Sequence, residues 1–168
     1  GPFLDVYASS ILPTPFHFLV RVPVVDEAYR ERALDEHTKL ALAFGGGKLS
    51  VDEFLEGQFR RFLGSYALSY NYDQNRKGPL FGQHIMHIPL PDREQTLLLI
   101  HYLHHHPVRS GLAGHCRDWR YSTYNAVLSD QPTAVARGKV LDWFEGENLA
   151  AGREAFIEFH DQEVDYEP

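Results

Sequence analysis

The stretch that most constrains this fold is residues 50–82, whose pattern is typical of one long helix with a sharp stop. Ser50, followed three residues later by Glu53, fits a capping box, in which each side chain bonds the other residue's backbone N–H at a helix start. Apolar side chains then recur at steps of three and four residues to about Tyr72, and a Gly-Pro pair soon afterwards breaks the pattern. We therefore predict a helix from about residue 51 to about residue 72.

The second half of this helix gathers tyrosines and basic side chains. Residues 57–82 contain Arg60, Arg61, Tyr66, Tyr70, Asn71, Tyr72, Arg76 and Lys77. A tyrosine flanked by basic pairs suits a protein that holds, or attacks, a nucleic-acid phosphate. The alternative is an amphipathic core helix with ordinary surface arginines, since aromatic residues at helical spacing usually mark a core.

Two short segments before this helix have the alternation of β-strands. Residues 3–9 and 16–24 are rich in strand formers, and the prolines between them suit a connection, so we predict an antiparallel pair. In the second strand, Phe16, Phe18 and Val20 should share one face, and His17, Leu19 and Arg21 the other.

The rest of the chain is mainly helical in pattern. We predict helices over residues 26–44, 93–104, 132–144 and 148–161, a strand over 81–90, a helix exit over 105–112, and a mixed turn and short helix over 118–128. The glycines at 45–47 end the first helix and suggest a mobile linker. This order predicts an α+β fold with helices packed on an antiparallel sheet, as residues 1–144, followed by a C-terminal helix and acidic tail, as residues 145–168.

The charge distribution leaves nucleic acid open as a partner. The net charge is −7, but residues 142–168 hold nine Asp and Glu against one Arg. Residues 57–140 hold ten Lys and Arg against five Asp and Glu. Local charge decides where a phosphate can dock, although a polar tail beside an average surface is the simpler alternative.

Several protein classes are excluded or disfavoured. The single cysteine, Cys116, excludes an internal disulfide framework and a four-cysteine zinc site. No apolar run approaches the roughly 20 residues of a membrane helix, and no signal peptide is visible, so we expect a cytoplasmic protein without a membrane partner. The sequence starts at Gly1 and Pro2 without a methionine, and we expect native residues upstream.

Histidines are the candidate metal ligands. The clusters are His84 with His87, His101, and the run 104–106, but adjacent histidines in one helix face different directions and cannot all bind one ion. His17 differs, because it lies on a predicted strand two residues after a loop.

Four motifs together resemble a known family. Residues 12–22, LPTPFHFLVRV, are similar to the L-P-N-H-F-H-F-L-V-R stretch of HUH-type tyrosine transposases. Residues 65–81, SYALSYNYDQNRKGPLF, resemble their S-Y-x-x-x-(F/Y)-N-x-x-x-x-R-x-G-x-L-F. Residues 102–112 and 118–128, YLHHHPVRSGL and DWRYSTYNAVL, resemble Y-I-H-x-N-P-V-R-x-G-L and D-W-x-(W/Y)-S-S-Y-x-A-x-L. Residues 133–160, which include KVLDWFEG and FIEFH, are similar to the C-terminal end of REP-associated tyrosine transposases.

The resemblance implies a fold and a chemistry. The family fold is an antiparallel sheet of the HUH, ferredoxin-like type with helices on its face. A histidine pair holds a divalent cation, Mg²⁺ or Mn²⁺, and a tyrosine attacks a phosphodiester of single-stranded DNA to give a 5′-phosphotyrosine and a free 3′-OH. Such a protein would act in DNA transposition and recombination on single-stranded or hairpin DNA. Relatives occur as monomers and as dimers, which leaves a homodimer open.

The resemblance assigns roles to particular residues. Tyr66 takes the nucleophile position and His17 a metal-ligand position. Asn71, which follows Tyr66 on the same helix, takes a phosphate-orienting or metal-completing position. Arg76, Lys77 and Arg109 are the candidates for contact with the DNA backbone, and ordinary surface charge is the alternative for each of the three. Tyr70 falls on a family aromatic, with core filler as its expected role.

The chain also departs from the family pattern. Pro15 stands where the family has the first histidine, and Thr14 where it has the preceding Asn. His106 stands at the Asn of H-x-N-P-V, and the sequence starts after the strand and helix that precede the position of residue 3 in the family. One imidazole holds Mg²⁺ or Mn²⁺ poorly, unless a ligand from His84, His87 or residues 104–106 substitutes.

These departures leave three functions open. The first is a transposase-like enzyme whose strand cleavage is impaired by the lost ligand. The second is a catalytically inactive, domesticated module that binds DNA hairpins. The third is a protein-interaction domain, which the acidic tail favours.

Overall fold

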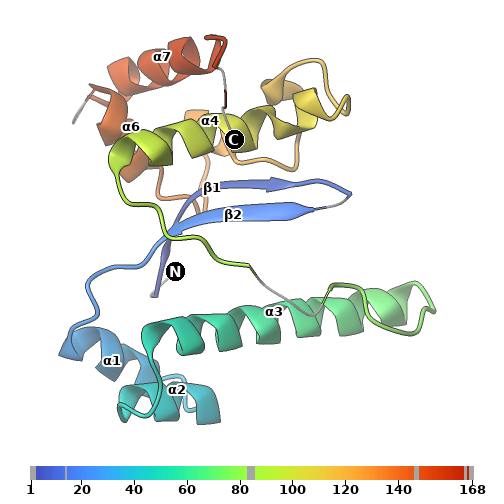
Figure 1. Ribbon diagram of the computed structural model, residues 1–168, viewed down its shortest axis with the longest axis vertical. Coiled ribbons are helices and arrows are strands. Elements are labelled where there is room, and N and C mark those ends of the chain that lie inside the picture. Colours follow the sequence, from blue (N-terminus) through green and yellow to red (C-terminus); the bar gives the residue numbers. More distant parts are fainter. Residues whose placement is uncertain (1–2, 14, 83–85, 146–147, 165, 167–168) are drawn as a thin grey trace. The chain divides into compact units, whose positions relative to one another are not determined.

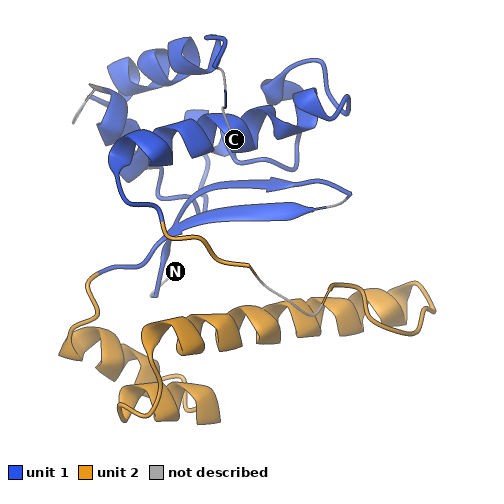
Figure 2. Ribbon diagram, viewed as in Figure 1, with its two compact units in different colours: residues 1–23, 90–168 blue, residues 24–89 orange. Residues whose placement is uncertain are grey.

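The computed structural model describes residues 3–13, 15–82, 86–145, 148–164 and 166 of the 168-residue chain. The chain forms two compact units: unit 1 is Gly1–Pro23 with Leu90–Pro168, and unit 2 is Val24–Pro89 (Figure 2). The described residues contain one two-stranded antiparallel sheet and seven α-helices. The prediction of a mixed α+β protein with an antiparallel sheet is confirmed in this form.

Unit 1 is built on a β-hairpin. Strands β1 (Asp5–Ile11) and β2 (Phe16–Arg21) pair antiparallel, with Ser10 opposite His17 and Ala8 opposite Leu19 (Figure 1). These four residues share one face, because paired residues in an antiparallel ladder point the same way and alternate residues repeat the face. Ala8 and Leu19 are buried against α4 (Arg93–Arg109), so this is the face that α4 covers.

The second edge of β1 is occupied by main chain from later in the sequence. Ile11 donates its N–H to the carbonyl of Tyr121 (3.0 Å), and Ala136 donates to the carbonyl of Val6 (2.8 Å). These bonds satisfy an edge that would otherwise offer unpaired backbone groups.

The core of unit 1 joins the hairpin to its helices. Around α4 lie the short 3₁₀ helix η1 (Cys116–Asp118), α5 (Tyr124–Leu128), α6 (Arg137–Glu145) and α7 (Leu149–His160). The cluster of buried hydrophobic side chains consists of Tyr7, Ala8, Leu19, Ile100, Leu103, Cys116, Tyr124, Val127, Val140, Leu141 and Phe156. The predicted helical regions near both α6 and α7 are confirmed.

Helix α4 is longer than predicted, since it continues through Pro107 to Arg109 instead of ending at residue 104. It stops in a Schellman motif, in which Gly111 has φ +69°, its N–H bonds the carbonyl of Val108, and Leu112 bonds that of Pro107 (both 2.9 Å). The helix accommodates Pro107 in its last turn, and Gly111 terminates the helix.

Unit 2 contains α1 (Glu27–Leu34), α2 (Lys39–Gly45) and α3 (Val51–Asp73). The prediction of one helix over residues 26–44 was wrong, because the chain turns at His37 (φ 53°) and Thr38 caps a new helix with its side chain. The rings of Phe44 and Phe54 stack with centroids 4.4 Å apart and join α2 to α3. The capping box at Ser50 and Glu53 is confirmed.

The glycines at 45–47 end a helix, as predicted. Gly47 has φ +74°, its N–H bonds the carbonyl of Phe44 (3.0 Å), and Lys48 bonds that of Ala43 (2.8 Å). This is again a Schellman motif, which fixes the path of the chain from α2 into α3.

The strand predicted over residues 81–90 is wrong for the part of it that the structure describes, residues 81–82 and 86–90, which form no ladder. Met86 and Ile88, two apolar residues of the predicted strand, are exposed. Alternation predicts a strand only where one face finds a core, and here it does not. His84 lies outside the described residues.

Candidate functional site

Helix α3 carries Tyr66 on its exposed second half. The Tyr66 side chain is 52% exposed, its ring stacks near Tyr70 with centroids 6.2 Å apart, and Phe81 lies 6.0 Å away. Tyr72 is 86% exposed. Phe54, in the first turn, is the one buried residue of α3. The core-helix interpretation therefore holds only at the start of α3, and Tyr70 is not core filler.

The exit turn of α3 is tied together by Asn71 and Arg76. Asn71 donates from Nδ2 to the carbonyl of Gly78 (2.8 Å). Arg76 donates from Nη1 to Oδ1 of Asn71 and from Nη2 to the carbonyl of Pro79, both at 3.2 Å. The helix ends with Asn75 at φ 47°, a left-handed position that asparagine tolerates. Two sequence-predicted site residues thus lie in one network.

The basic residues of α3 are not equivalent. Arg60 pairs with Glu56 one turn earlier (2.6 Å), so its charge is locally compensated. Arg61 donates to the side chain of Gln58 (3.2 Å). Arg76 and Lys77 are exposed at the exit turn. A phosphate near Tyr66 would therefore meet its positive charge mainly at the exit turn.

His17 lies on the face of β2 that α4 covers, and the structure brings it beside His106. Their ring centroids are 5.3 Å apart. Burial lowers the pKa of both imidazoles, and for His106 the neighbouring His17 and Arg109 lower it further. Both side chains are therefore neutral at pH 7, the form in which imidazole can accept a metal ion.

The residues present do not fit the Mg²⁺ or Mn²⁺ that the resemblance implies. These ions prefer several oxygen ligands, and Pro15 offers no side-chain donor at the position of the lost histidine. Within residues 3–13, 15–82, 86–145, 148–164 and 166, no three His, Cys, Asp or Glu side chains are grouped to hold a metal.

Arg109, the remaining predicted DNA contact, lies at the end of α4 in unit 1. Its guanidinium carbon is 4.8 Å from the ring centroid of Tyr166 and 5.5 Å from that of Tyr102. These cation–π contacts hold Arg109 against the C-terminal segment. In this structure Arg109 therefore contacts the C-terminal segment through Tyr166.

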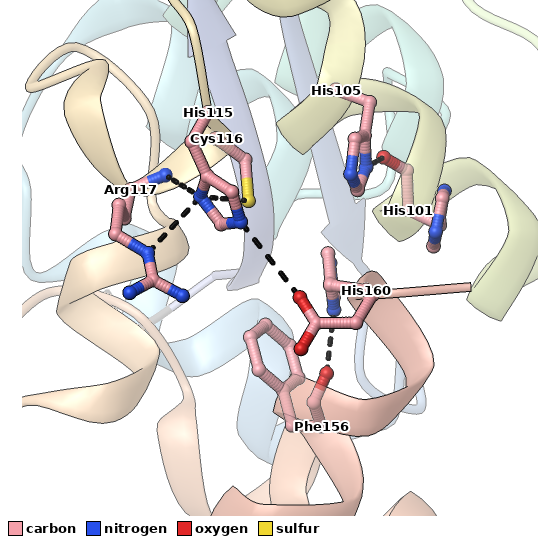
Figure 3. Close-up of polar contacts among 8 residues, drawn as sticks. His101, His105, His115, Cys116, Arg117, Phe156 and His160 are labelled. Atoms are coloured by element: carbon pink, nitrogen blue, oxygen red, sulfur yellow. Dashed lines mark hydrogen bonds and ion pairs between the residues drawn. The ribbon is translucent and has the colours of Figure 1, made fainter. Parts of the chain in front are cut away.

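A cavity of about 830 Å³ lies between α4, the loop before η1 and the C-terminal segment. His101, His105, Arg109, His115, His160 and Tyr166 are among its lining residues. Figure 3 shows His101 and His105 on one side and His115 with Cys116 on the other. His101 and His105 are four residues apart on one helix, a spacing that places them on one face and that the sequence interpretation left unused.

Histidines 104–106 diverge as predicted for adjacent residues of one helix. His104 is fully buried, His105 borders the cavity and His106 lies beside His17. Burial lowers the pKa of His104 to about 3, and burial with the neighbouring His104 lowers that of His160 to about 2.

Cys116, His115 and Asp161 form a row at the cavity wall. The Cys116 Sγ lies 3.4 Å from Nδ1 of His115, whose Nε2 lies 3.7 Å from a carboxylate oxygen of Asp161 (Figure 3). The order resembles a thiol–imidazole–carboxylate triad, but the thiol is fully buried and burial raises its pKa. A buried, protonated thiol is not an activated nucleophile, so this row is structural.

Comparison with known protein families, with curated proteins and with solved structures finds no match to this chain. No helix in the described ranges is long and apolar enough to span a membrane. Fold and site together define an α+β protein with an exposed tyrosine-bearing helix in unit 2 and a histidine-rich core in unit 1.

Proposed function

We propose that this chain binds single-stranded or hairpin DNA through the second half of α3 and its exit turn, in the manner of an HUH-type transposase-like protein. The observation that carries the proposal is the exposure of Tyr66, Tyr70 and Tyr72 on the half of α3 that leads into the exit turn, where a network holds Arg76. Aromatic side chains stack with bases, and basic side chains follow the phosphates of a single strand.

The local charge supports this choice over a protein-interaction role. Residues 58–77 contain four Lys and Arg and one acidic residue, Asp73, although the whole chain is acidic. The turn network fixes Arg76 before any ligand arrives, which lowers the entropy lost on binding. Several exposed aromatic side chains on one helix are typical of an interaction site.

Electrophoretic or anisotropy titration with a labelled DNA hairpin bearing single-stranded flanks tests the binding. We expect Arg76→Ala and Lys77→Ala each to weaken binding, and each to make the slope of log K against log salt less negative by about 0.7–0.9. Lys48→Ala removes the same charge from an exposed position in the turn before α3 and should bind like the parent. Binding that is absent, or independent of salt, would reject the proposal.

A second function, strand cleavage by Tyr66, is favoured by the exposure of its side chain. In this step the Tyr66 Oη forms a bond to phosphorus, the bond from phosphorus to the 3′ oxygen breaks, and the phenolic proton ends on that oxygen. The products are a 5′-phosphotyrosine and a 3′-OH. Since a tyrosine hydroxyl is a weak nucleophile unless it is activated, we expect slow cleavage in a chain that lacks the first histidine of the family pair.

Denaturing gels of the protein incubated with labelled DNA, Mg²⁺ and Mn²⁺ test the cleavage. We expect a covalent adduct from the parent and from Tyr72→Phe, and none from Tyr66→Phe. An adduct that survives in Tyr66→Phe, or no adduct at all, rejects the chemistry and leaves the DNA-binding proposal intact.

A further inference from the structure

Three buried polar atoms without hydrogen-bond partners gather on the α4-facing side of the hairpin. They are the Ser10 Oγ, the His17 Nε2 and the His106 Nδ1. Within the described ranges there are six such side-chain atoms, so half of them belong to this one place. Buried polar atoms are nearly always paired, and a group of unpaired ones points to an ion or water that completes them.

The backbone fixes how these residues meet. Ser10 and His17 are opposite each other in the β1–β2 ladder and so share a face. α4 places the His106 ring 5.3 Å, centroid to centroid, from the His17 ring. The two imidazoles come from a strand and a helix that both pack in unit 1, and Ser10 is itself fully buried. The arrangement therefore lies where α4 packs on the hairpin, with Ser10 fully buried and the two histidines half-buried.

We propose that His17 and His106 together bind one borderline transition-metal ion, such as Zn²⁺, Co²⁺ or Ni²⁺, through Nε2 of His17 and Nδ1 of His106. Imidazole nitrogens suit these ions, whereas Mg²⁺ and Mn²⁺ prefer oxygen. Two protein ligands leave the remaining coordination positions to water or to an oxygen of a bound ligand, and the Ser10 hydroxyl can donate a hydrogen bond to such an oxygen.

This ligand set differs from the one that the family resemblance implies. There, both histidines come from one strand, two residues apart. Here Pro15 removes the first of them, and the second imidazole comes instead from α4, at the position where the family has asparagine. With two imidazole ligands, the expected ion is Zn²⁺, Co²⁺ or Ni²⁺ instead of Mg²⁺ or Mn²⁺. The alternative occupant is a single water bonded to the three polar atoms, which would need no metal.

Metal titration of tag-free protein in the absence of DNA tests the site. We expect one Co²⁺ per chain with a visible absorption band, displaced by Zn²⁺ and not by Mg²⁺. His17→Gln and His106→Asn should each weaken that binding by at least about tenfold. His37→Gln removes an exposed histidine of unit 2 and should leave it unchanged. Equal binding by the parent and both site variants overturns the proposal.

Because a core variant can misfold, a measurement on the parent protein provides a second test. Co²⁺ broadens amide resonances near the bound ion, and we expect the first losses around residues 10, 17 and 106. Broadening centred on His101 and His105 at the cavity overturns the proposal, because the ion then binds elsewhere. No broadening at stoichiometric Co²⁺ also overturns it and indicates a bridging water. Neither result bears on DNA binding, so the two proposals fail separately.

Discussion

In the core of unit 1, Nδ1 of His104 lies 2.9 Å from Nε2 of His160. The other hydrogen bonds of the two rings determine which nitrogen of each ring carries the hydrogen. His160 must donate from Nδ1 to the carbonyl of Phe156 (2.8 Å), so its Nε2 accepts, and His104 donates to it from Nδ1. The Nε2 of His104 then accepts from the Thr123 hydroxyl at 3.0 Å, a shorter contact than the one from this hydroxyl to the carbonyl of Ser9 (3.3 Å). Both imidazoles are therefore neutral single tautomers.

This chain of hydrogen bonds between neutral histidines, called the histidine relay below, predicts that unit 1 loses stability as the pH falls. The pKa of His160 is lowered from 6.5 in the unfolded chain to about 2 in the fold, mainly by burial, so between these values only the unfolded state takes up the proton. The groups facing it are His101, His104 and His105 of α4 and Tyr124 of α5. The stability is fully present above about pH 6.5 and declines below it. Urea unfolding at pH 7.5 and 5.5, followed by tryptophan fluorescence, measures the decline.

Fluorescence reports unit 1 alone, because Trp119 and Trp143 both lie there. His160→Gln should lower stability at pH 7.5 by roughly 1–3 kcal/mol, since the neighbouring His104 loses a well-matched partner. It should also make the decline toward pH 5.5 shallower. His37→Gln changes an exposed histidine and should keep the parent slope. A parent protein equally stable at both pH values contradicts the relay.

Gly152 and Gly138 make a matched pair for the packing of α6 against α7. A Cβ on Gly152 would lie 3.1 Å from the carbonyl oxygen of Leu141, whereas a Cβ on Gly138 meets nothing within 4 Å. We expect Gly138→Ala to stabilise unit 1 by about 0.5–1 kcal/mol through helix propensity. Gly152→Ala should instead destabilise it by about 1 kcal/mol, because a backbone atom cannot move aside cheaply. Urea unfolding with fluorescence gives both signs, and a gain in both variants would show that the two helices can separate.

The elements that local signals determine were the ones predicted from sequence. The capping box at Ser50, the helix that follows it and the β-hairpin all depend on residues close together in the chain, and all were confirmed. The break at His37 and the extension of α4 through Pro107 were missed, because each is decided by which backbone conformation the packed chain accepts. The strand over residues 81–90 was predicted from its local residue pattern, which carries no information on whether a core lies beside it.

The same distinction between local and long-range contacts applies to the candidate site. Tyr66, Asn71 and Arg76 lie on one helix and its exit turn, as sequence reasoning placed them, and the contact of Asn71 with Arg76 spans only five residues. The approach of His17 and His106 joins residues 89 positions apart, and no local pattern encodes it. The histidine relay likewise needs α4 and α7 to pack before its members meet.

The capping box gives a test of unit 2. Ser50→Ala removes the hydroxyl that accepts from the Glu53 N–H and donates to the Glu53 carboxylate, but it keeps the backbone N–H of residue 50 that also donates to this carboxylate. It should destabilise the start of α3 by about 1 kcal/mol. Amide exchange of residues 52–54, measured by NMR, should speed up, while exchange in α4 stays unchanged. Ser65→Ala, at an exposed position inside α3, is the control and should not speed exchange at the helix start. Equal rates in Ser50→Ala and the parent would show that the box contributes nothing.

Asn71→Ala separates the order of the exit turn from its charge. The substitution removes the bonds to Gly78 and Arg76 but leaves every positive charge in place. DNA binding should then weaken by about fivefold, equivalent to ~1 kcal/mol of lost preorganisation, with the salt slope unchanged. Lys77→Ala, by contrast, should reduce the slope, because it removes a phosphate-binding charge. If Asn71→Ala binds as the parent does, the turn network is not part of the binding surface, and α3 itself must make the contacts. If instead Asn71→Ala changes the slope as Lys77→Ala does, then the network acts by holding the Arg76 charge on a phosphate.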